Sequence, residues 1–135
     1  MTRRAEGTFD VKTTPLPSDD ATSGTSIGRY SLTKELHCDL EATGKGVMIG
    51  AGELAEGNAG YVAMEQITGT LHGRSGSFAL QHFGTISQGS YDLSIKVVPG
   101  SGTGELAGIT GAMTITLVNG KHIYSLDYTL PEQGL

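Results

Sequence analysis

Residues 102–111 read Gly-Thr-Gly-Glu-Leu-Ala-Gly-Ile-Thr-Gly, and this stretch decides which fold the chain can adopt. It separates two apolar segments, 97–99 and 113–117, that have strand character. Glycine reaches positive φ easily and lets one backbone approach another closely, so glycines at this density mark bends in a β-sheet. The stretch therefore indicates a sheet that turns corners, and it carries no chemistry that would identify an activity.

Strand patterns separated by turn residues fill the rest of the first half. Residues 5–12 and 27–41 alternate apolar with polar side chains, which is the period of a half-buried strand. Between them, residues 13–26 collect Pro, Ser, Asp and Gly, and this composition predicts a long loop. After Gly-Lys-Gly at 44–46, residues 47–54 predict a short strand that glycine interrupts.

The second half continues the same pattern. Residues 61–72 and 77–87 predict two long strands that pair antiparallel. Further strands are predicted at 91–98, 112–118 and 122–130, and the last two flank Asn119-Gly120, the strongest short hairpin signal. No segment has the apolar spacing of an amphipathic helix.

We therefore predict an all-β fold for residues 1–135, as one domain with an antiparallel barrel of about eight strands. Closing the sheet removes exposed strand edges, and about eight strands enclose an interior that holds side chains or one small ligand.

Composition and charge exclude several classes of function. A net charge of −5 argues against a nucleic-acid partner, because such binding needs clustered Lys and Arg. The sequence has no run of about 18 apolar residues and no apolar stretch after Met1, so we expect no membrane span, no secretory signal and a cytoplasmic location. The one cysteine, Cys38, cannot form an intramolecular disulfide, and we expect a small buried thiol there.

Residues 60–65 (Gly-Tyr-Val-Ala-Met-Glu), the stretch 69–82 and the glycine-rich segment 102–111 look familiar together. They resemble a bacterial family of uncharacterised small proteins, which looks like a branch of the allene-oxide-cyclase-like barrels with the plant cyclases and dirigent proteins. The resemblance covers nearly the whole chain. It implies a barrel cavity that binds an apolar, reactive intermediate and guides its closure or coupling, and it implies a homo-oligomer. It transfers no catalytic residue to this sequence.

Two titratable residues are candidates for chemistry inside the barrel. His82 shares an alternation with Phe78, Leu80 and Ile86, so we expect it to point inward, where a hydrogen-bonded core histidine is the simpler interpretation. Glu65 shares an alternation with the apolar residues of 61–71, and desolvation there would raise its pKa. The opposite alternation of the same strand is nearly as apolar, and in that register Glu65 is a surface charge.

If Tyr61, Glu65 and His82 converge, they offer a phenol, a carboxylate and an imidazole to one polar group of a small apolar ligand. The same set also describes an ordinary hydrogen-bonded core. Further candidates for the lining are Tyr30, Cys38 and Tyr91, for which core packing is the simpler interpretation.

We predict no metal and no cofactor. His37, Asp39 and Glu41 alternate on one polar face, but residues on one face of a strand lie about 6–7 Å apart, so one strand alone does not close a metal site. Residues 100–104 are glycine-rich but lack the following Lys and helix of a phosphate-binding loop, and no nucleophile elbow is present.

Three functional hypotheses remain. The first is binding of a small apolar ligand in the barrel, with His82, Glu65 or Tyr61 at its polar end. The second is an isomerase or cyclase in which Glu65 supplies a proton. The third is a structural, self-associating barrel whose interior is filled by Phe78, Leu80 and Met64. The sequence leaves open whether the protein is an enzyme.

Overall fold

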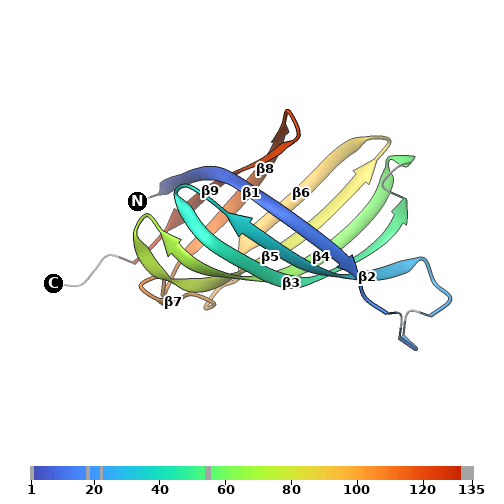
Figure 1. Ribbon diagram of the computed structural model, residues 1–135, viewed down its shortest axis with the longest axis horizontal. Helices are drawn as coiled ribbons and strands as arrows, with labels where there is room; N and C mark the ends of the chain where they lie inside the picture. The colour runs from blue at the N-terminus through green and yellow to red at the C-terminus, as the bar shows by residue number, and fades with distance from the viewer. Residues whose placement is uncertain (1, 18, 22, 54–55, 132–135) are drawn as a thin grey trace.

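The computed structural model describes residues 2–17, 19–21, 23–53 and 56–131, and it contains nine β-strands (Figure 1). The strands are β1 (Arg3–Pro15), β2 (Ile27–Leu36), β3 (Leu40–Glu53), β4 (Asn58–Leu71), β5 (Arg74–Ser87), β6 (Ser90–Val97), β7 (Thr103–Gly104), β8 (Thr110–Val118) and β9 (Lys121–Thr129). Within the described ranges, no helix has the length and apolar character that a membrane span requires.

The strands form a closed antiparallel barrel. Their order is β4-β3-β2-β1-β9-β8-β6-β5, and pairing of β4 with β5 closes the ring of eight. The short β7 pairs with β5 from outside this ring. The predicted all-β barrel of about eight strands is therefore confirmed, and β4 and β5 pair antiparallel as expected.

Three hairpins use the two-residue turns that favour a right-handed twist. Both central residues have positive φ in His72-Gly73 (48° and 80°), Gln88-Gly89 (49° and 80°) and Asn119-Gly120 (50° and 79°). Such pairs form type I′ turns, which match the twist of the flanking strands. The hairpin predicted at Asn119-Gly120 is confirmed. The β4–β5 turn takes only residues 72–73, so β5 begins at Arg74, three residues before the strand predicted at 77–87.

Two predicted boundaries in the first half are wrong. Residues 27–41 do not form one strand, because β2 ends at Leu36 and residues 37–39 turn the chain, with Cys38 at a φ of 82°. The predicted loop 13–26 begins later, because residues 13–15 pair with β2 and extend β1. Within the predicted loop 13–26, Ser18 and Thr22 lie outside the described ranges. Leu54, the predicted end of the strand 47–54, also lies outside them.

The Gly-Lys-Gly segment at 44–46 does not interrupt the sheet, since it lies within β3 and pairs along β4. Gly44 and Gly46 face the barrel interior, where β3 and β4 approach closely. A Cβ atom on Gly46 would lie 2.0 Å from the carbonyl oxygen of Met64. Glycine at this position is therefore a requirement of packing, not a signal that the strand ends.

The glycine-rich stretch 102–111 connects β6 to β8 and closes one end of the barrel. Its Leu106 and Ile109 are each 1% exposed and join the main core. A Cβ atom on Gly102 would lie 2.1 Å from the carbonyl oxygen of Leu106, and Gly108 has a φ of 82°, so these glycines permit a tight connection. The stretch forms an end cap and only a two-residue strand, not the sheet corner that its sequence predicts.

The other end of the barrel is less closed. β6 and β8 pair only at Ile95 with Met113 and at Lys96 with Ala112. Figure 1 shows the β5–β6 and β8–β9 hairpins as separate projections. Toward this end, before Ile95 on β6 and after Met113 on β8, side chains on the inward alternation are exposed to solvent. Leu117, for example, is 63% exposed. The barrel thus has one filled end and one open end.

Candidate functional site

Glu65 and His82 meet inside the barrel, at the border between its filled and open halves. On the paired strands β4 and β5, Glu65 lies opposite Leu80 and His82 lies opposite Ala63, so the two residues are diagonal neighbours on one face. His82 Nε2 lies 2.6 Å from Glu65 Oε1, and the two residues are 4% and 2% exposed. The inward orientation expected for His82 is observed, and of the two orientations that the sequence left open for Glu65, the structure has the inward one.

Lys34 completes this cluster, although its sequence position did not single it out as a site residue. Its Nζ atom lies 2.9 Å from the same Glu65 Oε1, and the residue is 5% exposed. The ammonium group also lies 4.7 Å from the centroid of the Phe9 ring, which is a favourable cation–π distance. A signal was present, because Lys34 occupies the inward alternation between Leu32 and Leu36. A charged residue on that face needs a buried partner.

The two hydrogen-bond partners keep Glu65 ionised. Burial would raise the pKa of the Glu65 carboxyl, but the hydrogen bonds with His82 and Lys34 and the nearby positive charge outweigh it, and the pKa lies below its ordinary value of 4.5. The expectation of a raised Glu65 pKa is therefore wrong. The physical reason is that the hydrogen bond with His82 and, after it, the positive charge of Lys34 favour the ionised carboxylate more than burial disfavours it.

Two atoms of the cluster have unused hydrogen-bonding capacity. Glu65 Oε2 is buried and has no hydrogen-bond partner, and it lies against Gly44, where a side chain would otherwise fill the space. Among the described residues, no hydrogen bond involves His82 Nδ1. Because the Glu65 carboxylate only accepts, Nε2 must carry the proton of that hydrogen bond, and Nδ1 of a neutral His82 is then an acceptor.

Tyr61 lies on β4 one inward position beyond Ala63, the residue opposite His82, and so closer to the open end of the barrel. Its ring centroid is 6.4 Å from that of His82, and it packs over Gly84, where a Cβ atom would lie 2.8 Å from Tyr61 Cε1. Burial raises the pKa of Tyr61, and the Glu65 carboxylate raises it further, so the phenol remains a hydrogen-bond donor. The structure thus brings Tyr61, Glu65 and His82 together.

The further lining candidates have different outcomes. Tyr30 is half-buried on the inward alternation of β2. Cys38 is exposed in the β2–β3 turn, so the expectations of a buried thiol and of a lining role are wrong. Tyr91 is 74% exposed, because the first residues of β6 extend beyond the part of the strand that β8 covers, and it does not line the interior.

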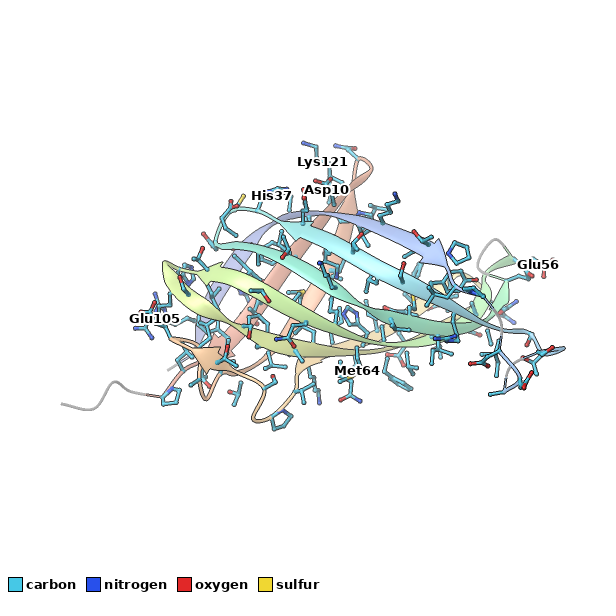
Figure 2. The ribbon with its side chains drawn as sticks, turned by 60° about the horizontal axis from the view of Figure 1, so that its bottom comes forward. Asp10, His37, Glu56, Met64, Glu105 and Lys121 are labelled. Carbon is cyan, nitrogen blue, oxygen red and sulfur yellow. The ribbon has the colours of Figure 1, made fainter. Side chains whose placement is uncertain are left out.

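The row His37, Asp39 and Glu41 does not form one face, because the turn at Cys38 breaks the alternation. Glu41 Oε1 instead accepts a hydrogen bond from the Cys38 amide. His37 lies near Asp10 and Glu35, with ligand atoms within 4.8 Å of one another, and Figure 2 shows His37 and Asp10 side by side on the outer surface. Among the described residues, this is the only group of three His, Cys, Asp or Glu side chains close enough to share a metal ion, and its two carboxylates are exposed to solvent.

A groove of about 320 Å³ lies on the outer side of β1, β2 and β3. Its lining residues are Asp10, Val11, Lys12, Thr33, Lys34, Glu35, Thr43, Gly44 and Lys45. Apart from Lys34, whose side chain enters the interior, the charged residues of this groove lie on the outward alternation of their strands, so the groove opens on the outer side of the sheet.

Comparison with known proteins gives a fold and no activity. The sequence model of a family described as "Protein of unknown function (DUF3224)" matches residues 5–128. A crystal structure of a protein with unknown function from the DUF3224 family of Shewanella oneidensis MR-1 is 42% identical, with a TM-score of 0.90 over 98% of this chain and 100% of that chain. No protein of curated function matches. The resemblance to allene-oxide-cyclase-like barrels stays a prediction.

Proposed function

We propose that this chain, which belongs to the DUF3224 family of proteins of unknown function, binds a small apolar molecule with one polar group in the open half of its barrel. The observation that carries the proposal is the buried Lys34–Glu65–His82 cluster with two unused hydrogen-bonding atoms. An apolar interior with a few fixed polar groups is the usual composition of a small-molecule site.

Stability alone does not account for the cluster. Removing three charged or polar groups from water has a large desolvation penalty, and well-packed apolar residues of similar volume are often as stabilising or more so. The rest of the filled half is packed with apolar side chains, and Phe78, Leu80 and Ile67 are each 0% exposed. A buried charge cluster beside an open end therefore favours a role in recognition over a role in packing.

The open half offers apolar surface for the body of the ligand. Val11, Leu93 and Leu117 lie on the inward alternations of β1, β6 and β8 and are 38%, 39% and 63% exposed. A ligand that covers these side chains gains roughly 25 cal/mol for each Å² of apolar surface removed from water. The gap in pairing between β6 and β8 gives the ligand a route between these strands.

The polar end of the ligand is recognised beside Tyr61 and His82. A hydroxyl group suits this position, because its proton can be donated to His82 Nδ1 while its oxygen accepts from the Tyr61 phenol. The Glu65 carboxylate fixes the His82 ring through Nε2, and Lys34 holds that carboxylate. Catalysis with Glu65 as proton donor is not supported, since Glu65 is ionised in this cluster.

The test is native mass spectrometry after incubation with a chloroform–methanol extract of the expression host. We expect the wild type to carry a small-molecule adduct that is lost on denaturation. The Lys34→Met/Glu65→Leu/His82→Phe variant keeps a core of similar volume, and we expect it to carry none. No adduct on the wild type, or the same adduct on both proteins, would contradict the proposal.

A further inference from the structure

A second surface remains unexplained by the ligand site. Five exposed apolar residues lie together on the outer face of β3, β4 and β5, and we refer to them as the outer apolar patch: Val47, Ile49, Val62, Met64 and Phe83. They are 41%, 41%, 48%, 50% and 59% exposed. Figure 2 shows Met64 pointing away from the barrel.

The patch is contiguous because its members are cross-strand partners. Val47 lies opposite Met64 on β3 and β4, and Ile49 lies opposite Val62. On the other side, Val62 lies opposite Phe83 of β5. Directly opposite residues of an antiparallel pair have Cβ atoms about 4.5–5.5 Å apart, so these side chains form one surface.

The size and composition of the patch are those of an interface core. The five side chains expose on the order of 400 Å² of apolar surface, in the range of the largest patch on a typical monomer, which often has a function. Interface cores are enriched in Met and aromatic residues and depleted in charged ones, as this patch is. Polar neighbours surround the patch and enlarge the surface that a partner could cover. A specific interface buries roughly 800 Å² on each partner. These neighbours are Ser31, Gln66, Gln81, Thr85 and Ser94.

We infer that two copies of this chain associate through the outer apolar patch. The charges around the patch favour a second copy. Arg29 on β2 lies beside Ile49, and Asp92 on β6 lies beside Thr85, so opposite charges flank the patch on its two sides. A two-fold axis along β4 places β2 of one copy opposite β6 of the other. Arg29 then faces the partner's Ser94, one outward position from its Asp92. The long Arg29 side chain, which also pairs with Asp19 of its own chain at 3.6 Å, reaches toward that carboxylate at two symmetric places.

Two further charges complete the rim. Lys45 lies beside Val47 on β3, and Lys96 on β6 lies opposite Gln81. In the same arrangement Lys96 faces the neutral Ser31 of the second copy. The rim thus carries three positive charges and Asp92. The Asp92 carboxylate has a complementary partner in Arg29 of a second copy, whereas an anionic bilayer would repel it.

The test is sedimentation velocity of the full chain over a concentration series. We expect a dimer for the wild type and at least about thirtyfold weaker association for Met64→Lys, the loss typical of a central interface residue. The matched control is Val118→Lys, which places the same charge on another exposed apolar position and leaves the dimer intact. Circular dichroism spectra of all variants should coincide.

A charge exchange tests the orientation. Asp92→Arg should weaken the dimer, and the double variant Arg29→Asp/Asp92→Arg should restore it. A wild type that is monomeric up to millimolar concentration, or a Met64→Lys variant that dimerises as well as the wild type, would overturn the inference. It would also be overturned if the monomeric wild type bound phosphatidylserine vesicles through the patch. None of these substitutions touches the buried cluster.

Discussion

Glu65 Oε1 accepts hydrogen bonds from His82 Nε2 at 2.6 Å and from Lys34 Nζ at 2.9 Å, inside a barrel whose neighbouring core positions are apolar. One carboxylate oxygen therefore serves two positive or polar partners, while the other oxygen has none. This relationship places a charge cluster at the border between the filled and open halves of the barrel.

Removing one charge from the cluster should destabilise the protein strongly. Glu65→Gln leaves Lys34 buried without its counter-charge, and we expect the free energy of unfolding to fall by about 3–5 kcal/mol. Urea denaturation followed by circular dichroism measures this change. Glu35→Gln, on the exposed face of β2, is the matched control and should stay within about 0.5 kcal/mol of the wild type.

Replacing the whole cluster by apolar residues should not destabilise the protein. In Lys34→Met/Glu65→Leu/His82→Phe no buried charge remains, so we expect unfolding to require as much free energy as in the wild type, or about 1–4 kcal/mol more. The same urea titration gives the comparison. A triple variant that is less stable than Glu65→Gln would show that the cluster is needed for packing.

The cluster should make stability depend on pH at the acidic end. The pKa of Glu65 is lowered in the folded protein, so the unfolded chain binds more protons at Glu65 as the pH falls below 4.5. Its contribution is present above pH 4.5 and is lost as the pH falls through the folded pKa. The stability of the wild type relative to the triple variant should therefore decrease between pH 6 and pH 3, about the ordinary range of carboxyl titration. A constant difference would mean that Glu65 is not ionised in the fold.

Glycine should be irreplaceable at one inner position of β3. In Gly46→Ala the new Cβ atom meets the backbone of β4 at 2.0 Å, and a backbone cannot move aside as a side chain does. We expect a loss of at least about 1–3 kcal/mol, or failure to fold. Gly60→Ala on β4 is the control, because its nearest contacts lie at 3.7 Å. Thermal denaturation should separate the two variants clearly.

Hydrogen exchange should reveal the gap between β6 and β8. Only two residue pairs join these strands, whereas β3 pairs with β4 along its whole length. We expect amides within 114–118 that face β6 to exchange at least about tenfold faster than amides in the middle of β3, because local opening there breaks fewer hydrogen bonds. Ligand from the host extract should slow this exchange. Uniform protection around the ring would argue against an entrance here.

The alternation of the sequence was sufficient to predict the barrel and its best-defined strands. Asn119-Gly120 predicts a hairpin, and the apolar neighbours of His82 predict its inward face, whereas both faces of the Glu65 strand are apolar enough to leave its orientation open. The Gly-Lys-Gly segment at 44–46 misled, because local patterns do not distinguish a glycine that ends a strand from one that lets a neighbouring strand approach.

The composition of the site depended on contacts between distant strands. Lys34 is 31 positions from Glu65, and its role appears only once β2 and β4 face each other across the interior. The sign of the Glu65 pKa shift depended on the hydrogen bond with His82 and on the charge of Lys34, which together outweigh burial. Cys38 and Tyr91 were misplaced because a turn and a strand end, which set their exposure, are the least predictable features of a β-sequence.

The most direct test of ligand binding in the barrel is the ¹⁵N spectrum of the His82 imidazole, recorded on the wild type before and after loading from the host extract. The proposed site predicts that Nδ1 shifts on loading, while Nε2 keeps the signature of its hydrogen bond to Glu65. A loaded protein whose His82 resonances are unchanged would place the ligand elsewhere and contradict the account.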